Sequence, residues 1–255
     1  MIAGIPISAV SGVAVDRPTP EPMQASVTGL TKGLPGSALT PYLKQKLAWH
    51  DCDEGDDTVC ATVRAPLDYA DPQGRAVTLA LRKLPATRTP RLGSLFINPG
   101  GPGASGRDFV DRFDRSGLEQ YDIVGWDPRG SGGSTPISCL SDTEVDTYQN
   151  LDASPDDQAE RDALIAANYT FGQSCWKRNG DLLSHIGTVD TVQDLDLLRA
   201  LVGDSKLNYV GYSYGTRIGA TYAELFGSKV GHLVLDAAVD ITDNSEVIQA
   251  QGFDL

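Results

Sequence analysis

The chain has 255 residues, 40% of them hydrophobic and 22% charged, so it can bury the core of one large domain or of two small ones. Its formal net charge is -13, and so acidic a chain lacks the basic surface that a nucleic-acid partner requires. The acidity either keeps the protein soluble or attracts a cationic substrate such as a peptide N-terminus. No stretch approaches the ~20 apolar residues of a membrane span, and we expect no membrane partner.

The first 42 residues have the composition of a leader and a linker. Residues 2–15 are small and apolar, as in the central region and cleavage zone of a secretory signal, but no basic residues precede them. They indicate either a partial signal peptide whose start codon is misplaced or a flexible leader. Residues 16–41 are rich in Pro, Gly, Ser and Thr and are typical of a linker. We therefore predict a leader or partial signal peptide with its linker in residues 1–42, and a secreted or cell-envelope location.

Residues 43–239 alternate predicted strands with predicted helices. The helix that begins near Ser154 has Ser as its N-cap and Pro155 at its first position. Strands that alternate with helices imply a mostly parallel sheet with crossover connections, which is an α/β fold. Residues 240–255 are polar, and we assign them to the start of a cap region. The predicted strands are 58–63, 75–84, 94–97, 121–126, 207–210 and 230–235, and the predicted helices are 105–115, 154–177, 191–202 and 214–226.

Four cysteines form two pairs that are local in sequence, each among polar residues typical of loops. We predict the disulfides Cys52–Cys60 and Cys139–Cys175, and hence an oxidising compartment; the alternative is four reduced, buried thiols. No C-x-x-C motif occurs, and His50 alone beside Cys52 makes a poor zinc site. The cysteines therefore do not predict a zinc site.

Ser213 has the sequence context of a catalytic nucleophile. It is the central residue of Gly-Tyr-Ser-Tyr-Gly, which follows a predicted strand and precedes a predicted helix. A G-x-S-x-G sequence in this context is typical of the nucleophile elbow of acyl hydrolases, where Gly211 and Gly215 leave room for a sharp turn. The alternative is a glycine-rich turn without catalytic function.

Two further loops follow predicted strands. An acyl-transfer enzyme needs backbone N–H donors for its oxyanion. We predict that the N–H groups of Tyr214 and Gly101 supply them, Gly101 lying in the Asn-Pro-Gly-Gly-Pro-Gly sequence of residues 98–103. The alternative for residues 98–103 is a plain Gly/Pro turn. In the loop of residues 127–134 we expect Arg129 to pair with a carboxylate in a structural role.

Several segments together resemble the secreted bacterial tripeptidyl aminopeptidases, relatives of prolyl iminopeptidase among the α/β-hydrolases. The resemblance runs from about Trp49 to Asp240. It implies an α/β-hydrolase fold and a serine exopeptidase that releases short peptides from free N-termini through an acyl-enzyme, without metal or cofactor. By this resemblance Ser213 is the nucleophile, and Tyr214 and Gly101 form the oxyanion hole. The segments that carry it are residues 60–63, 66–70, 98–106, 126–130, 211–216 and 235–240.

The chain departs from that family in its catalytic base. In the family a helical cap follows the sixth strand, and the catalytic Asp and His come later. The only histidines here are His50, His185 and His232, none of which lies after the last strand, and Asp236 is expected to be a structural partner of a neighbouring loop. We therefore expect a fold truncated before the cap and the last strands, with a base that a complementing C-terminal segment supplies.

Three functions remain open at this point. The first is an aminopeptidase with a peptide substrate. The second is an esterase or another acyl hydrolase on the same scaffold, because fold alone does not set specificity. The third is a non-catalytic remnant that keeps the core of the fold.

Overall fold

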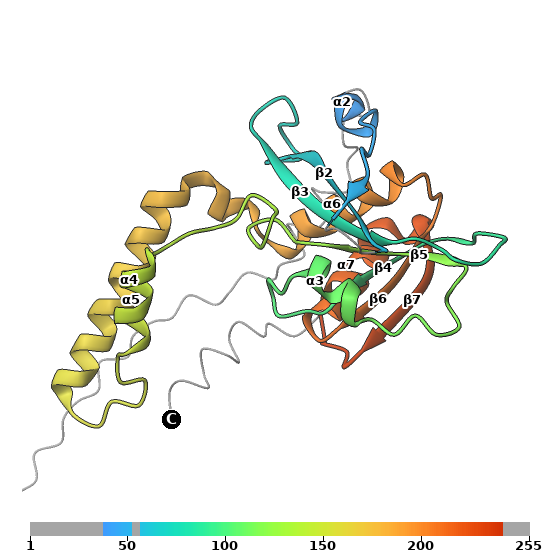
Figure 1. Ribbon diagram of the computed structural model, residues 1–255. Coiled ribbons are helices and arrows are strands. Elements are labelled where there is room, and N and C mark those ends of the chain that lie inside the picture. The colour runs from blue at the N-terminus through green and yellow to red at the C-terminus, as the bar shows by residue number, and fades with distance from the viewer. Residues whose placement is uncertain (1–37, 53–56, 242–255) are drawn as a thin grey trace, which may run out of the picture. The chain divides into compact units, whose positions relative to one another are not determined.

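The computed structural model describes residues 38–52 and 57–241 of the chain (Figure 1). Residues 1–37 of the leader and linker predicted over residues 1–42, and residues 242–255 of the cap start predicted over residues 240–255, lie outside the described residues. Among the described residues, no helix combines the length and the apolar character that crossing a membrane requires.

A seven-stranded mixed sheet forms the centre of the fold, in the order β1-β2-β3-β5-β4-β6-β7. The strands β5, β4, β6 and β7 pair in parallel, while β1, β2 and β3 join that half of the sheet through antiparallel pairings. The α/β class is confirmed. The strand bounds are β1 His50–Asp51, β2 Val59–Pro66, β3 Ala76–Leu84, β4 Gly93–Asn98, β5 Tyr121–Trp126, β6 Leu207–Tyr212 and β7 Val230–Asp236.

The central strands β4 and β5 are buried on both faces, and alternating side chains of β4 enter two separate cores. In β4, Phe96 belongs to the larger core, whereas Leu95 and Ile97 belong to the smaller one. The helices α6 (Thr188–Leu201) and α7 (Tyr214–Phe226) contribute to the larger core. The short helix α3 (Gly106–Phe109) and the 3₁₀ helix η1 (Val110–Arg112) cover the other face (Figure 1).

Glycine lets α3 (Gly106–Phe109) pack directly on the sheet. A β-carbon at Gly106 would lie 2.1 Å from the carbonyl oxygen of Trp126, and one at Gly125 would lie 2.0 Å from that of Gly106. Because neither position can hold a side chain, the start of α3 lies against the end of β5. The loops after β4 and β5 therefore lie at the carboxyl edge of the sheet, where β6 also ends.

Three of the sequence-based helices needed correction. The helix expected over residues 191–202 is α6, which begins at Thr188 and ends at Leu201. The helix expected over residues 105–115 consists of α3 followed by η1 (Val110–Arg112), so it ends earlier. The helix expected from Ser154 is α5 (Gln158–Asn179), whose N-cap is Asp157. Asp157 prevails because it forms a capping box with Glu160, each side chain accepting the other residue's backbone N–H.

A helix that was not predicted, α4 (Asp142–Gln149), precedes α5. It begins with a capping box between Ser141 and Glu144, and none of its residues is buried. Its weak apolar periodicity explains why it was missed, since hydrophobic periodicity is the main helix signal. Among the described residues, α2 (Thr40–Leu43) is a single turn of α-helix, and η2 (Gly180–His185) and η3 (Gly227–Lys229) are short 3₁₀ helices.

Both expected disulfides are present. Cys52 bonds Cys60 beside the first strands, and Cys139 bonds Cys175 between the segment before α4 and the last turns of α5. The alternative of four reduced thiols is therefore wrong. The longer disulfide and the ion pair of Arg178 with Glu144, 2.8 Å apart, hold α5 to the segment that carries α4.

Candidate functional site

Ser213 lies at the sharp turn between β6 and α7 and its side chain is exposed. Its backbone dihedrals, φ 52° and ψ −122°, are unusual for a residue with a side chain and are maintained only where surrounding structure imposes them. The flanking glycines make the turn possible, because a β-carbon at Gly211 would lie 2.4 Å from the carbonyl oxygen of Gly215. The strand, turn and helix therefore present the Ser213 hydroxyl at the edge of the sheet.

Hydrogen bonds from Thr216 and to the end of β7 hold this turn, including one from the Thr216 N–H to the carbonyl oxygen of Ser213 at 2.9 Å. The N–H of Ser213 donates to the carbonyl oxygen of Asp236 at 3.0 Å. The Thr216 hydroxyl donates to the carbonyl oxygen of Ser213 at 2.6 Å and accepts the N–H of Val239 at 2.9 Å. Since Thr216 is fully buried, this hydroxyl ties the strained residue to the segment that follows β7. Asp236 is thus the structural partner that the sequence predicted, through its backbone.

The glycine-rich loop after β4 lies directly against this turn. A β-carbon at Gly100 would lie 3.0 Å from the nitrogen of Tyr214 and 3.1 Å from the β-carbon of Ser213. The N–H of Gly100 donates to Asn98 Oδ1 at 2.9 Å. Among the described residues, no acceptor is bonded to the N–H groups of Gly101 and Tyr214. The loop after β4 and the start of α7 thus each place one unpaired N–H group, that of Gly101 and that of Tyr214, near the serine hydroxyl.

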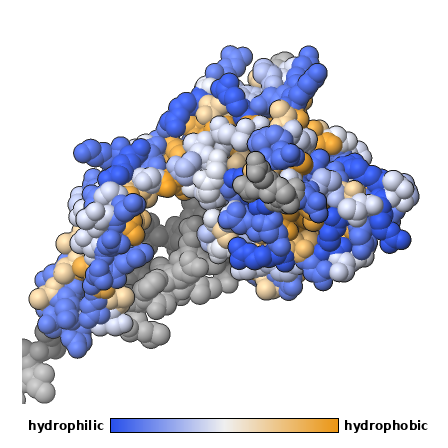
Figure 2. Space-filling view, in the orientation of Figure 1, coloured by the Kyte–Doolittle hydropathy of each residue, from blue (hydrophilic) through white to orange (hydrophobic). Residues whose placement is uncertain are grey.

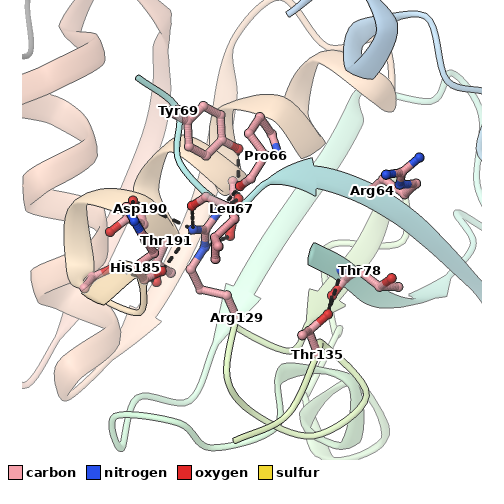
Figure 3. A network of polar contacts seen from close by, with 12 residues as sticks. Arg64, Pro66, Leu67, Tyr69, Thr78, Arg129, Thr135, His185, Asp190 and Thr191 are labelled. Atoms are coloured by element: carbon pink, nitrogen blue, oxygen red, sulfur yellow. Dashed lines mark hydrogen bonds and ion pairs between the residues drawn. The ribbon is translucent and has the colours of Figure 1, made fainter. Parts of the chain in front are cut away.

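Arg129 sits in a buried network that links three segments (Figure 3). Its Nε and Nη2 donate to the two carboxylate oxygens of Asp194, both at 2.7 Å, and Tyr69 donates its hydroxyl to the same carboxylate at 2.8 Å. Its guanidinium also donates to the carbonyl oxygens of Pro66, Leu67 and His185. Arg129 therefore pairs with a carboxylate, as expected, and fixes the loop after β5 to α6.

The protonation of this network follows from burial and charge. Burial opposes the charge of Arg129, but the Asp194 carboxylate outweighs burial and raises the pKa of Arg129. Burial raises the pKa of Asp194, and the charge of Arg129 opposes that shift. Burial also raises the pKa of Asp190, whose carboxylate lies 3.7 Å from Arg129. The network is a fully hydrogen-bonded ion pair, so its role is structural.

The same helix also contacts the elbow. The hydroxyls of Thr188 and Tyr214 are hydrogen-bonded at 2.5 Å. Thr188 is the first residue of α6, the helix that carries Asp194. Helix α6 thus binds both the side chain of Tyr214, the residue after the serine, and the loop that contains Arg129. Sequence reasoning missed Thr188, Asp194 and Thr216, of which only Thr216 had a local signal, its place in the helix directly after the motif.

The three histidines lie apart from the Ser213 hydroxyl, which makes no hydrogen bond to any described residue. His50 Nδ1 is 3.3 Å from the carbonyl oxygen of Ala48, and His185 Nδ1 is 3.9 Å from Asp190. His232 Nδ1 is 3.0 Å from Asn208 Oδ1. Because Asn208 precedes Ser213 by five residues of strand, His232 lies about 16 Å from it. Within residues 38–52 and 57–241, no histidine completes a triad.

One acidic cluster has ligand atoms close enough to hold a cation. The carboxylates of Asp156, Asp157 and Glu160 lie within 4.8 Å of one another and are largely exposed. Hydrogen bonds already engage them, because Glu160 accepts the N–H of Asp156 at 3.0 Å and Asp157 accepts that of Glu160 at 2.9 Å. The backbone N–H groups of Asp156 and Asp157, both donated to the Glu160 carboxylate, lower the pKa of Glu160. Together with the bond from the Glu160 N–H to Asp157 they begin α5, which is a sufficient structural role.

Comparison with known proteins relates the chain to one family. The family model described as the alpha/beta hydrolase fold matches residues 93–255. The chain is 38% identical over 204 residues to the tripeptidyl aminopeptidase of Streptomyces lividans, which covers 75% of the chain and 38% of that protein. It is 40% identical over 232 residues to serine protease Hip1 of Mycobacterium tuberculosis, covering 84% and 44%. It is 39% identical over 223 residues to carboxylesterase B of Mycobacterium tuberculosis, covering 81% and 43%. The matched stretch thus spans less than half the length of each of these relatives.

Proposed function

The chain belongs to the α/β-hydrolase family, and from this membership we propose that it is a serine hydrolase in which Ser213 is the nucleophile. The predicted resemblance to the tripeptidyl aminopeptidases agrees with the relatives found. In the proposed reaction, Ser213 Oγ attacks the carbonyl carbon of the substrate and gives its proton to a base. The base passes that proton to the leaving amine as the C–N bond breaks, and water then hydrolyses the acyl-enzyme.

One observation carries the proposal: the glycine-rich loop and the elbow meet at Gly100. The backbone there leaves the Tyr214 N–H and the adjacent Gly101 N–H without acceptors among the described residues. Unpaired backbone donors held in advance of the reaction stabilise an oxyanion without reorganisation, and each contributes roughly 3–4 kcal/mol in known acyl hydrolases. We assign these two donors to the oxyanion hole.

We propose that the base is supplied by a complementing segment of the protein. The support is twofold: no histidine of the chain contacts the Ser213 hydroxyl, and the matched relatives are more than twice as long as the matched stretch. Without a base, a serine is a weak nucleophile at neutral pH, and oxyanion donors with binding alone leave a rate enhancement of about 10³–10⁴ over water.

For the substrate we propose a peptide with a free N-terminus, from which short peptides are released. The support is the name and similarity of the tripeptidyl aminopeptidases, and the net charge of -13, which favours a cationic N-terminus. The similarity to a carboxylesterase supports ester hydrolysis as the second candidate. We also propose an extracellular or cell-envelope location, which both disulfides favour.

Parallel assays of the longest product of the gene distinguish the candidates. Tripeptidyl arylamides and short-chain aryl esters are offered to the wild-type protein and to the Ser213→Ala variant. We expect cleavage of the tripeptidyl arylamide that depends on Ser213. Ester cleavage without amide cleavage would replace the peptidase by the esterase, and cleavage of neither would favour the non-catalytic remnant.

A further inference from the structure

Asn98 is a polar residue that lies wholly inside the molecule, at the proposed active site. Hydrophilic residues make up much of the surface in Figure 2, but Asn98, the last residue of β4, is 0% exposed. Its Nδ2 atom has no hydrogen-bond partner among the described residues. A buried donor without a partner lowers stability, so the stability of the fold does not by itself account for an asparagine at this position.

Asn98 contacts both the glycine-rich loop and the elbow. Its Oδ1 atom accepts the N–H of Gly100 at 2.9 Å. A β-carbon at Gly215 would lie 2.7 Å from the backbone oxygen of Asn98 and 2.9 Å from its Oδ1. Asn98 also lies opposite Gly211 in the pairing of β4 with β6. One buried residue therefore touches both segments that carry the proposed oxyanion donors.

Two hydrogen bonds fix the orientation of the loop at Gly101. The Asn98 side chain engages the N–H of Gly100, so that group is not free for a substrate. The N–H of Ala104 donates to the carbonyl oxygen of Gly100 at 3.3 Å. In a trans peptide the carbonyl and the N–H point in opposite directions, and the Gly101 N–H belongs to the same peptide as the Gly100 carbonyl. The Gly101 N–H therefore points away from Ala104 and remains the free donor.

We propose that Asn98 is a positioning residue: it binds the Gly100 N–H and thereby selects the Gly101 N–H as the loop donor that faces Ser213. The inference rests on the proposed function, because it concerns the oxyanion hole of the same site. Asn98 acts through the backbone of the loop and does not touch the substrate. Without its acceptor, the Gly100 N–H is unpaired and competes with that of Gly101, so the oxyanion loses a donor held in advance of the reaction.

Two small substitutions separate the acceptor from the size of the side chain. Asn98→Ala removes the acceptor, whereas Asn98→Ser keeps an oxygen that can accept the N–H two residues later. The readout is the rate at which Ser213 of the folded full chain reacts with a fluorophosphonate, its oxygen bonding phosphorus as fluoride leaves and its proton passes to solvent. Loss of one oxyanion donor slows acyl hydrolases by about 10²–10³-fold, so we expect labelling about a hundredfold slower in Asn98→Ala and within about tenfold of the wild type in Asn98→Ser.

Asn98→Asp adds a readout that a purely structural role would not change. The neutral carboxyl has the shape of the amide and keeps the acceptor, whereas the ionised carboxylate opposes the negative charge of the oxyanion. We expect the ratio of its labelling rate to that of the wild type to rise about tenfold as the pH falls and the buried carboxyl becomes protonated. Among the described residues no ionisable side chain is hydrogen-bonded to Asn98, and Tyr209, which donates its hydroxyl to the carbonyl oxygen of Gly215, stays neutral because burial raises its pKa.

Asn208→Ala is the matched control, because Asn208 lies near the opposite end of β6 and is hydrogen-bonded to His232 rather than to the loop. We expect it to be labelled at the wild-type rate. Urea unfolding of each variant gives the folded fraction to which its rate is referred. Hydrogen exchange of the Gly100 amide, which we expect to be faster in Asn98→Ala than in Asn98→Ser, reports the hydrogen bond independently of any reaction.

The outcomes separate this inference from the proposed function. An alanine variant that is labelled as fast as the wild type overturns the positioning role alone, and so does a rate ratio for Asn98→Asp that is independent of pH. A serine variant as slow as the alanine variant also overturns it, because the amide nitrogen rather than the acceptor would then matter. A wild-type chain that is not labelled at Ser213 overturns the proposed function, and the positioning role with it.

Discussion

Gly100 packs against the backbone of Tyr214 so closely that a β-carbon at residue 100 would lie 3.0 Å from the Tyr214 nitrogen. Residue 100 belongs to the loop after β4, and Tyr214 begins α7, more than a hundred residues later. The contact joins the two halves of the proposed oxyanion hole. It also explains why a glycine stands there, since the backbone of the elbow occupies the space of a side chain.

The first prediction concerns this contact. Gly100 has φ +96° and a β-carbon there would lie 2.5 Å from the carbonyl oxygen of Tyr212, whereas Gly103, with φ +85°, has no heavy atom within 4 Å of the same position. We expect Gly103→Ala to lower the free energy of unfolding by about 1–2 kcal/mol, from backbone strain alone. Gly100→Ala adds a clash and should cost about 3–5 kcal/mol. Urea unfolding of both variants measures the difference, and equal costs would contradict the packing.

The second prediction concerns the buried hydroxyl of Thr216. Replacing it with Val keeps the shape but leaves the carbonyl of Ser213 and the N–H of Val239 without this partner. We expect Thr216→Val to lower the free energy of unfolding by about 2 kcal/mol and to slow the reaction of Ser213 with an active-site phosphonate. Thr216→Ser keeps the hydroxyl and should retain the rate of phosphonate labelling. A valine variant that reacts as fast as the wild type would show that the hydroxyl does not hold the elbow.

The third prediction contrasts two carboxylates around Arg129. Asp194→Asn breaks a buried pair with two hydrogen bonds and should cost about 3–5 kcal/mol of unfolding free energy. Asp190 only approaches Arg129, at 3.7 Å, and burial raises its pKa above that of an unfolded chain. Ionised Asp190 therefore costs stability at neutral pH, and that cost disappears as the pH falls below its pKa in the unfolded chain.

The resulting measurement is a pair of stability profiles against pH. Asp190→Asn should equal or exceed the wild type in unfolding free energy at neutral pH, and the excess should vanish in acid as Asp190 of the wild type becomes protonated. Asp194→Asn should be less stable than the wild type at neutral pH. A loss of stability in Asp190→Asn at neutral pH would mean that the charge of Arg129 outweighs the burial of Asp190.

The fourth prediction concerns the disulfides, which close loops of different length. The cysteines are 36 residues apart in Cys139–Cys175 and 8 apart in Cys52–Cys60. Loop-closure entropy predicts that replacing both cysteines of the longer disulfide by serine costs about 4 kcal/mol, and of the shorter about 2.5 kcal/mol. Thermal unfolding of the two double variants tests which loss of stability is larger. A larger loss for the shorter disulfide would mean that contacts in the folded state outweigh chain entropy.

Local patterns predicted most of the sheet and the elbow. The strand over residues 121–126 and the helix over residues 214–226 match β5 and α7, because apolar runs end at clear turn residues. The helix α4 was missed because its side chains are polar, although the Ser141 and Glu144 capping box is a signal that sequence carries. The start of α5 was predicted wrongly because Ser154 and Asp157 are both residue types that cap helices.

The contacts that hold the site were beyond local patterns. That Arg129 pairs with a carboxylate was predicted, but the choice of Asp194 depends on where α6 packs, 65 residues later in the chain. The link from Thr188 to Tyr214 depends on the same packing. Such pairings follow from the tertiary arrangement, and a single sequence does not specify them.

We propose that Ser213 is a nucleophile beside backbone donors already in place, and that none of the three histidines of the chain is its base. Labelling with a fluorophosphonate, followed by mass spectrometry of the peptides, tests it directly. We expect a slow adduct on Ser213 that disappears in Ser213→Ala and persists unchanged in His50→Ala, His185→Ala and His232→Ala. An adduct confined to another serine would show that Ser213 is not the nucleophile, and loss of the Ser213 adduct in a correctly folded histidine variant would show that this histidine is its base.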